Sequence, residues 1–155
     1  MLTFFADFLD RLEVMHAAIE EALDGLPSEA LDWQPGPEMN SIVVLAAHTA
    51  GAERYWIGDV AGQEPSGRVR ELEFAAKGVE TAVLIAKLRA SLDHSRTILG
   101  LLTLNDLEQE RVSPRDGRVF TAGWALLHGL EHTALHTGHI QLTSQLWNNR
   151  SQSSR

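Results

Sequence analysis

The chain contains no cysteine, and this absence removes three kinds of chemistry at once. A disulfide, a thiolate nucleophile and a cysteine-ligated zinc site all require that residue. Any metal site must therefore use other ligands. The sequence also lacks the two glycine-rich nucleotide motifs, G-x-G-x-x-G and G-x-x-x-x-G-K-[ST], so no nucleotide or phosphate-binding loop is indicated.

Positive charge is scarce as well. Lysine and arginine number 13 against 21 aspartates and glutamates, which gives a formal net charge of −8. Because binding to a polyanion requires a basic face, this balance argues against nucleic acid and anionic lipid as partners. No apolar run approaches the roughly 20 residues that cross a bilayer, and the first residues lack the features of a signal peptide. We therefore expect a cytoplasmic protein with no membrane partner.

A length of 155 residues is enough for one domain with a real core. We expect that domain over residues 1–150, followed by a disordered polar tail, RSQSSR, over 151–155. Apolar residues recur at intervals of three or four in long stretches, which predicts helices, and strand signals are few. The sequence thus predicts an all-α protein.

Four long helices are predicted, over residues 3–24, 40–60, 79–102 and 121–147, with one further helical turn at 28–32. Four helices of 20 or more residues with two long connections are typical of a four-helix bundle. The third helix has a predicted inward seam of apolar and small residues: Ile85, Leu88, Leu92, Ser95, Leu99 and Leu102.

The connections carry turn signals. Gly25 ends the first helix, and Asn40 or Ser41 can cap the second. Residues 62–78 form a glycine- and proline-containing loop that is long enough to cross the end of the bundle. The segment VSPRDGRVF predicts a short hairpin around Asp116–Gly117.

The most informative feature is a run of four histidines, His128, His132, His136 and His139, in HGLEHTALHTGH. At about 100° per residue they project at roughly 0°, 40°, 80° and 20°, so all four share one helical stripe. Three leucines project onto or beside this stripe, which predicts that it faces the core: Leu135, Leu142 and Leu146. Burying an imidazole without a partner costs about 1–3 kcal/mol. A metal cation is the partner that would satisfy several imidazoles together.

Two histidines four residues apart on a helix can chelate one ion, and both His128/His132 and His132/His136 have that spacing. Such a pair alone is weak evidence, because it recurs by chance in many helices. His48 lies on the apolar side of the second helix, where a lone histidine is more often a hydrogen-bonded core residue. Together with a chelating pair, it completes a three-histidine site with one open position, an arrangement typical of catalytic zinc.

Other residues are secondary candidates. His16 lies on the apolar face of the first helix and could approach the site as a proton donor, although a core role is the commoner one. His139 is expected to line the cavity rather than bind the metal. Either Tyr55 or Trp56 could wall the cavity, and simple core packing is the alternative for both.

Two charged residues follow His48 on the same predicted helix. Glu53 could act as a general base, with solvent exposure as the favoured reading, and Arg54 is a weaker candidate for steering an anionic substrate. The zincin motif H-E-x-x-H is absent, because the chain reads H-T-A-L-H. Only one Glu-x-x-His spacing exists, Glu13 to His16, so a ferritin-type di-iron site is not supported either. The predicted site is mononuclear.

The segments LDWQPGPEMNSIVVLAAHTAGAERYWIGD and LLHGLEHTALHTGHIQLTSQLW resemble the DinB-like (YfiT-like) superfamily of small bacterial four-helix-bundle proteins. The family commonly has histidine, three residues, histidine and then a small run ending in Gly-Gln. Gly138 fits this pattern, whereas His139 stands where glutamine is usual. The resemblance extends over most of the chain.

The resemblance implies an up-down-down-up bundle that binds one divalent metal through His48, His132 and His136. His128 would then line the cavity or support His132. The implied metal is Zn²⁺ or Ni²⁺, and the implied assembly is a homodimer. The implied activity is that of a thiol-dependent transferase or isomerase, or of a hydrolase. Some relatives use mycothiol or bacillithiol, which indicates a low-molecular-weight thiol as partner. The alternative is a non-catalytic stress-response or binding bundle in which metal is structural or absent.

Overall fold

The computed structural model describes residues 1–150, and the predicted disordered tail at 151–155 lies outside the described residues. Four long helices make up most of the protein: α1 (Thr3–Leu23), α3 (Ile42–Glu53), α5 (Thr81–Leu101) and α6 (Ala122–Arg150). The prediction of an all-α four-helix bundle is confirmed. None of the helices in the described part has a stretch apolar and long enough to cross a membrane.

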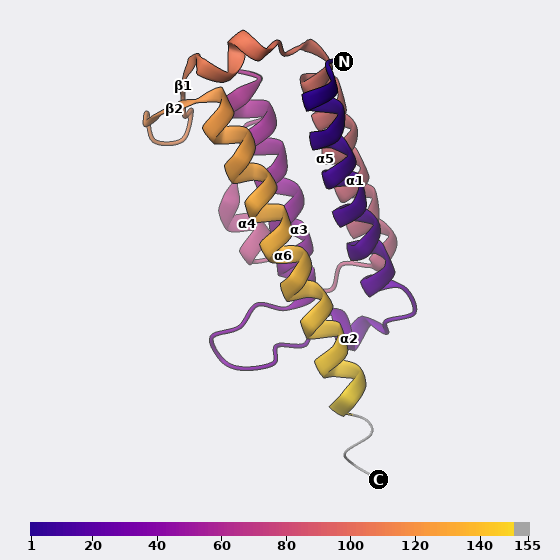
Figure 1. Cartoon of the computed structure of the whole chain (residues 1–155). Helices are drawn as coiled ribbons and strands as arrows, with labels where there is room; N and C mark the ends of the chain where they lie inside the picture. Colours follow the sequence, from indigo (N-terminus) through magenta and orange to yellow (C-terminus); the bar gives the residue numbers. More distant parts are fainter. Residues whose placement is uncertain (151–155) are drawn as a thin grey trace.

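The four helices run up, down, down and up. Helices α1 and α6 point in one direction and α3 and α5 in the other, so α3 and α5 are parallel although they are successive long helices (Figure 1). Each long helix packs against two others, and α3 lies between α5 and α6. The topology therefore places His48, on α3, beside the helix that carries the histidine run.

The ends of α1 and α3 follow from local chemistry. Helix α1 ends one residue before the predicted position, and Gly25 follows with a φ of 69°, a left-handed conformation that favours glycine. The short helix α2 (Ser28–Asp32) has the predicted bounds. Ser41 caps α3, because its hydroxyl accepts a hydrogen bond from the Val44 backbone N–H at 3.4 Å.

Helix α3 continues directly into a π-helical segment, η1 (Arg54–Ala61). The backbone N–H of Gly62 donates to the carbonyl of Ile57 at 2.9 Å, the i to i+5 pattern of a π-helix. The wider turn buries Tyr55 and Trp56 together with Ile57. Hydrophobic spacing predicted the helix to about residue 60 but not its change of pitch.

The connection from η1 to α5 contains a helix that the sequence did not reveal. Residues 62–78 were predicted to be a loop, but Arg70–Phe74 forms the one-and-a-half-turn helix α4 against α3. Five residues are too few to produce a helical periodicity, and so short a helix depends on tertiary contacts.

A small β-hairpin lies between α5 and α6 in the sequence. After the 3₁₀ helix η2 (Leu104–Glu108), strands β1 (Glu110–Val112) and β2 (Val119–Thr121) pair antiparallel, with Arg111 opposite Phe120. Gly117 has a φ of 69° in the connecting turn. The hairpin predicted around Asp116–Gly117 is thus confirmed.

The residues that are buried on α5 and α6 differ from those predicted from the sequence. The predicted seam of α5 is rotated, because only its Leu88, Ser95 and Leu99 are fully buried; the other inward residues are Leu84, Ser91 and Ile98.

The histidine stripe of α6 does not face the core, and that prediction was wrong. All three leucines beside it are exposed: Leu135 (54%), Leu142 and Leu146. The inward face belongs to small residues, including Gly129, Thr133 and Thr137. These positions are one residue beyond each histidine, about 100° around the helix. The histidines therefore lie on the flank of α6 that borders α3.

Candidate metal centre

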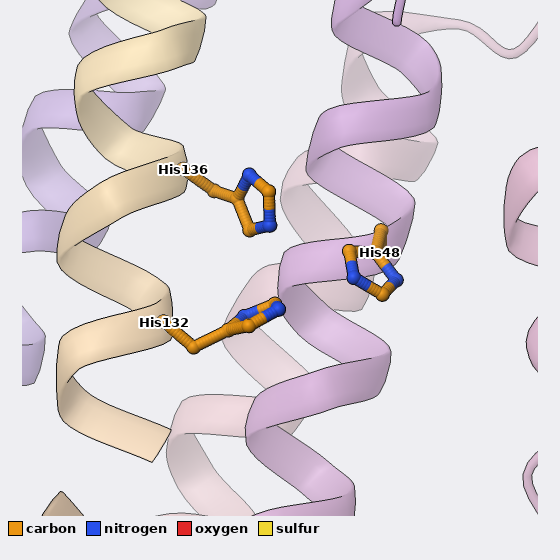
Figure 2. Close-up of side chains that lie close together, drawn as sticks. All are labelled: His48, His132 and His136. Atoms are coloured by element: carbon orange, nitrogen blue, oxygen red, sulfur yellow. The ribbon is translucent and has the colours of Figure 1, made fainter. Parts of the chain in front are cut away.

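Three histidines converge between α3 and α6. His48 projects from α3, while His132 and His136 project from successive turns of α6 into the same space (Figure 2). One ring nitrogen from each lies within 4.8 Å of the others. The ring centroid of His48 is 4.9 Å from that of His132 and 5.2 Å from that of His136. The two α6 rings are 4.4 Å apart.

This arrangement fits a divalent cation. A tetrahedral zinc ion with bonds of about 2.0–2.1 Å holds its ligand nitrogens about 3.4 Å apart, so small side-chain rotations would suffice. Nδ1 of His132 is buried and has no hydrogen-bond partner among the described residues. Imidazole nitrogens are suitable ligands for zinc, nickel, copper and iron, so the donor set is compatible with a metal without choosing one.

The electrostatics of the site keep two of the rings neutral. Burial, together with the neighbouring His136 and His48, lowers the pKa of His132 to about 3. Burial also lowers the pKa of His136 to about 4, with contributions from His48 and His139. Both imidazoles are therefore uncharged near pH 7, the state in which a ring nitrogen can bind a metal.

His48 is oriented by a carboxylate from α4. Its Nδ1 lies 2.8 Å from Oε2 of Glu73, and Arg68 holds the same carboxylate with two hydrogen bonds of 2.6 Å. Burial opposes ionisation of Glu73, but the hydrogen bonds from Arg68 and His48 outweigh it and lower the pKa of the carboxyl group. The carboxylate accepts from Nδ1–H, so Nε2 of His48 remains available to a metal.

A glycine on α3 makes room for this carboxylate. A Cβ atom at Gly51 would overlap the carboxylate of Glu73 and lie 3.2 Å from Nε of Arg68. Glycine in a helix interior costs about 1 kcal/mol relative to alanine. Here it permits Glu73 to lie against α3 one turn from His48.

An open cavity of about 310 Å³ adjoins the cluster, with His48 and His132 on its wall. Trp56, Trp124 and His128 form an aromatic side of the same cavity. The rings of Trp124 and His128 are stacked at 4.9 Å, and Trp56 meets His128 edge-on at 4.6 Å. The histidine cluster is thus reached from a walled space large enough for a small molecule.

The sequence matches a known protein family over most of its length. A family model described as "Mycothiol-S-transferase" matches residues 7–147. The chain belongs to the mycothiol-S-transferase family. The DinB-like resemblance is confirmed with it, and no curated protein matches in sequence.

Solved structures share the fold of this family member at low sequence identity. A conserved protein from Enterococcus faecalis superposes with a TM-score of 0.79 at 16% identity, covering 94% of this chain and 98% of its own. YfiT from Bacillus subtilis, called a probable metal-dependent hydrolase with an unusual four-helix bundle topology, gives 0.74 at 15%, covering 96% and 90%. A mycothiol-dependent maleylpyruvate isomerase gives a TM-score of 0.63 at 16% identity, covering 88% of this chain and 62% of its own. At such identities these likenesses support the fold alone.

Four secondary candidates lie near the cluster. His128 and Trp56 line the cavity. His139 is 3.3 Å from His136 between Nδ1 atoms and borders a separate hollow of about 240 Å³ on that side. Tyr55 does not line the cavity of His48; it borders an adjoining hollow, and its hydroxyl lies 2.6 Å from that of Ser113.

His16 has the core role that was its favoured alternative, whereas the expectation for Glu53 was wrong. His16 does not line the cavity; its Nε2 lies 2.6 Å from Oε2 of Glu53 in the core. Glu53 was expected to be exposed, yet its side chain is fully buried, and Ser95 donates to its other oxygen at 2.8 Å. Nor does Arg54 reach the cavity, because it pairs with Asp59 at 2.7 Å.

Proposed function

We propose that this chain is a metal-dependent thiol S-transferase that holds one Zn²⁺ or Ni²⁺ ion with His48, His132 and His136. The observation that carries the proposal is the convergence of these three rings on the wall of an open cavity. Membership of the mycothiol-S-transferase family supports mycothiol, or another low-molecular-weight thiol, as the co-substrate. The name of the related maleylpyruvate isomerase is consistent with that choice.

The residues around the site have distinct tasks. A bound divalent ion would lower the pKa of a thiol or water and so supply a nucleophile near pH 7. Glu73 and Arg68 hold His48 in one orientation and one tautomer. Trp56 and Trp124 provide an apolar wall that shields the reacting groups from bulk water.

A three-ligand site favours catalysis over the rival structural role. Among the described residues, the group able to hold an ion contains three histidines and no fourth ligand. A purely structural zinc site is normally closed by four protein ligands. A stress-response bundle without chemistry would not need the cavity beside the site. A homodimeric assembly and a cytoplasmic location stay predictions.

Metal content provides the first test. Untagged protein, stripped with a chelator and reloaded, should bind about one Zn²⁺ or Ni²⁺ per chain by mass spectrometry of the metal. His132→Ala should lose this metal, whereas His94→Ala, a matched change on α5, should retain it. Unchanged metal content in His132→Ala would defeat the assignment.

Thiol binding provides the second test. In cobalt-substituted protein, added mycothiol should produce a near-ultraviolet charge-transfer band, because a thiolate sulfur bonded to Co²⁺ absorbs there. Absence of the band with full cobalt occupancy would contradict the transferase assignment. Metal-dependent ester or amide cleavage without a thiol would instead favour a hydrolase, the activity in the name of the YfiT relative.

A further inference from the structure

The polar part of the cavity wall is strongly basic. Four arginines line it together with His48 and His132, and no acidic residue of the described chain does: Arg68, Arg70, Arg115 and Arg118. The whole sequence has only 13 lysines and arginines and a net charge of −8. The cavity thus gathers nearly a third of the positive side chains of an acidic protein.

These arginines come from two segments that are far apart in the sequence. Arg68 and Arg70 lie just before and at the start of α4, whereas Arg115 and Arg118 belong to the turn of the β1–β2 hairpin. Tyr55 lies between the segments: the guanidinium carbons of Arg68 and Arg115 are each 5.5 Å from its ring centre. The basic wall is therefore a product of the tertiary fold.

The carboxylates nearby do not neutralise this wall. Glu73 pairs with Arg68, and Asp116 is shared by Arg118 at 2.9 Å and Arg115 at 3.3 Å. Four positive groups against two negative ones leave a surplus of two positive charges. No carboxylate of the described chain pairs with Arg70, whose guanidinium lies over the ring of Phe74 at 4.4 Å.

We infer that the cavity binds an organic substrate with at least two negative charges, carried by carboxylate or phosphate groups, beside the three histidines. Planar guanidinium groups form paired hydrogen bonds with either oxyanion. The negative remainder of the surface repels such an anion, and the local surplus draws it into the cavity. The tryptophans of the wall would contact its carbon skeleton. This inference rests on the proposed function, because it concerns the second substrate of that site.

Calorimetric titration with small probes tests the inference. The probes are succinate as a dicarboxylate, inorganic phosphate, and succinamide as an uncharged match for succinate. We expect succinate or phosphate to bind at one per chain and succinamide not to bind. Succinate alone would identify carboxylates as the recognised groups, and phosphate alone a phosphate group. Failure of both anions, or equal binding of succinamide, would overturn the inference.

Arginine variants assign the binding to this wall. Arg70→Gln and Arg115→Gln should each weaken anion binding about tenfold, the loss expected for one hydrogen bond to a charged group. Arg89→Gln is the matched control, because Arg89 is an exposed arginine on α5 that pairs with Glu20. Thermal melts would verify that each variant is folded. Equal anion affinity in all three variants would contradict the proposal that the anion binds to the arginines of this cavity.

Titrating metal-free and zinc-loaded protein separates this inference from the proposed function. If zinc loads but neither anion binds, the substrate class is wrong while the metal assignment stands. If an anion binds in an arginine-dependent way but zinc does not load, the metal-dependent function is wrong while the anion site stands.

Discussion

Two of the histidine–glutamate pairs in the described part of the chain resemble each other in bonding but differ in surroundings. In the core, His16 and Glu53 are 2.6 Å apart, with side-chain exposures of 3% and 0%. At the cavity, His48 and Glu73 are 2.8 Å apart, with exposures of 9% and 11%. The core carboxylate has a serine as its second partner, and the cavity carboxylate has an arginine.

The difference in surroundings gives the two pairs different roles, one in the packing of the helices and one at the proposed metal site. The core pair links α1 to α3 and, through Ser95, to α5, so its polar atoms specify how three helices fit together. The cavity pair instead orients a ring beside two further histidines and an open space. Loss of the first should cost stability, and loss of the second should cost metal affinity.

The largest effect is expected from Glu53→Ala. Removing this carboxylate leaves His16 and Ser95 without their partner in the core, which should cost about 3 kcal/mol or more. For a chain of this size, that corresponds to a decrease in Tm of about 6–12 °C. Thermal unfolding followed by circular dichroism measures it. The folded variant should still bind zinc at one per chain; loss of zinc without loss of stability would reverse the assignment of the two pairs.

Glu73→Gln should give the opposite result. An amide cannot replace the charged acceptor of the His48 N–H, and such changes typically weaken metal binding about 10- to 100-fold. Competition with a chromophoric zinc chelator provides the affinity. We expect a smaller change in Tm for the metal-free protein than in Glu53→Ala, since the Glu73 side chain is 11% exposed whereas that of Glu53 is fully buried. Wild-type zinc affinity in this variant would show that His48 needs no orienting carboxylate.

Gly51→Ala should reproduce part of that loss without altering any polar group. The new methyl group would occupy the place of the Glu73 carboxylate and push it from His48. Zinc affinity should decrease about tenfold, at the lower end of the range for lost orienting groups. Gly138→Ala on α6 is the control, because a Cβ there would point into open space. Equal zinc affinity in both alanine variants would contradict the role given to Gly51.

The smallest effect is expected at the hairpin beside the cavity. The pKa of Asp116 is lowered, first because Ser113 donates a hydrogen bond to its carboxylate and then through Arg118 and Arg115. A lowered folded-state pKa contributes stability above the unfolded value of about 3.8, and this is lost as pH falls through the folded value. The Tm difference between wild type and Asp116→Asn should therefore shrink from pH 6 towards pH 2. A constant difference would show that the charge of Asp116 contributes no stability.

Much of the fold could be predicted from the sequence because its helices are long and periodic. The bounds of α1 and α2 and the cap at Ser41 agree closely with local signals. Helical spacing and the apolar face of His48 indicated a chelating pair on α6 together with His48, but both His128/His132 and His132/His136 had that spacing. The family resemblance was needed to select His132 and His136. Their geometry is as expected, although their role as ligands stays a proposal.

The residues that sequence reasoning missed have no local signature. Glu73 is 25 residues from His48, and the short helix that carries it has too few residues for a detectable period. Glu53 looked like a surface residue because a charged side chain is rarely buried without a partner. Its partner, His16, lies on another helix. Such pairings depend on the tertiary arrangement.

The most direct test of the central claim is a crystal structure of zinc-soaked protein with anomalous data collected above and below the zinc edge. The account predicts a single strong anomalous peak about 2.0–2.1 Å from one ring nitrogen each of His48, His132 and His136. A peak elsewhere, such as between His136 and His139 alone, or no peak at full zinc saturation, would contradict it.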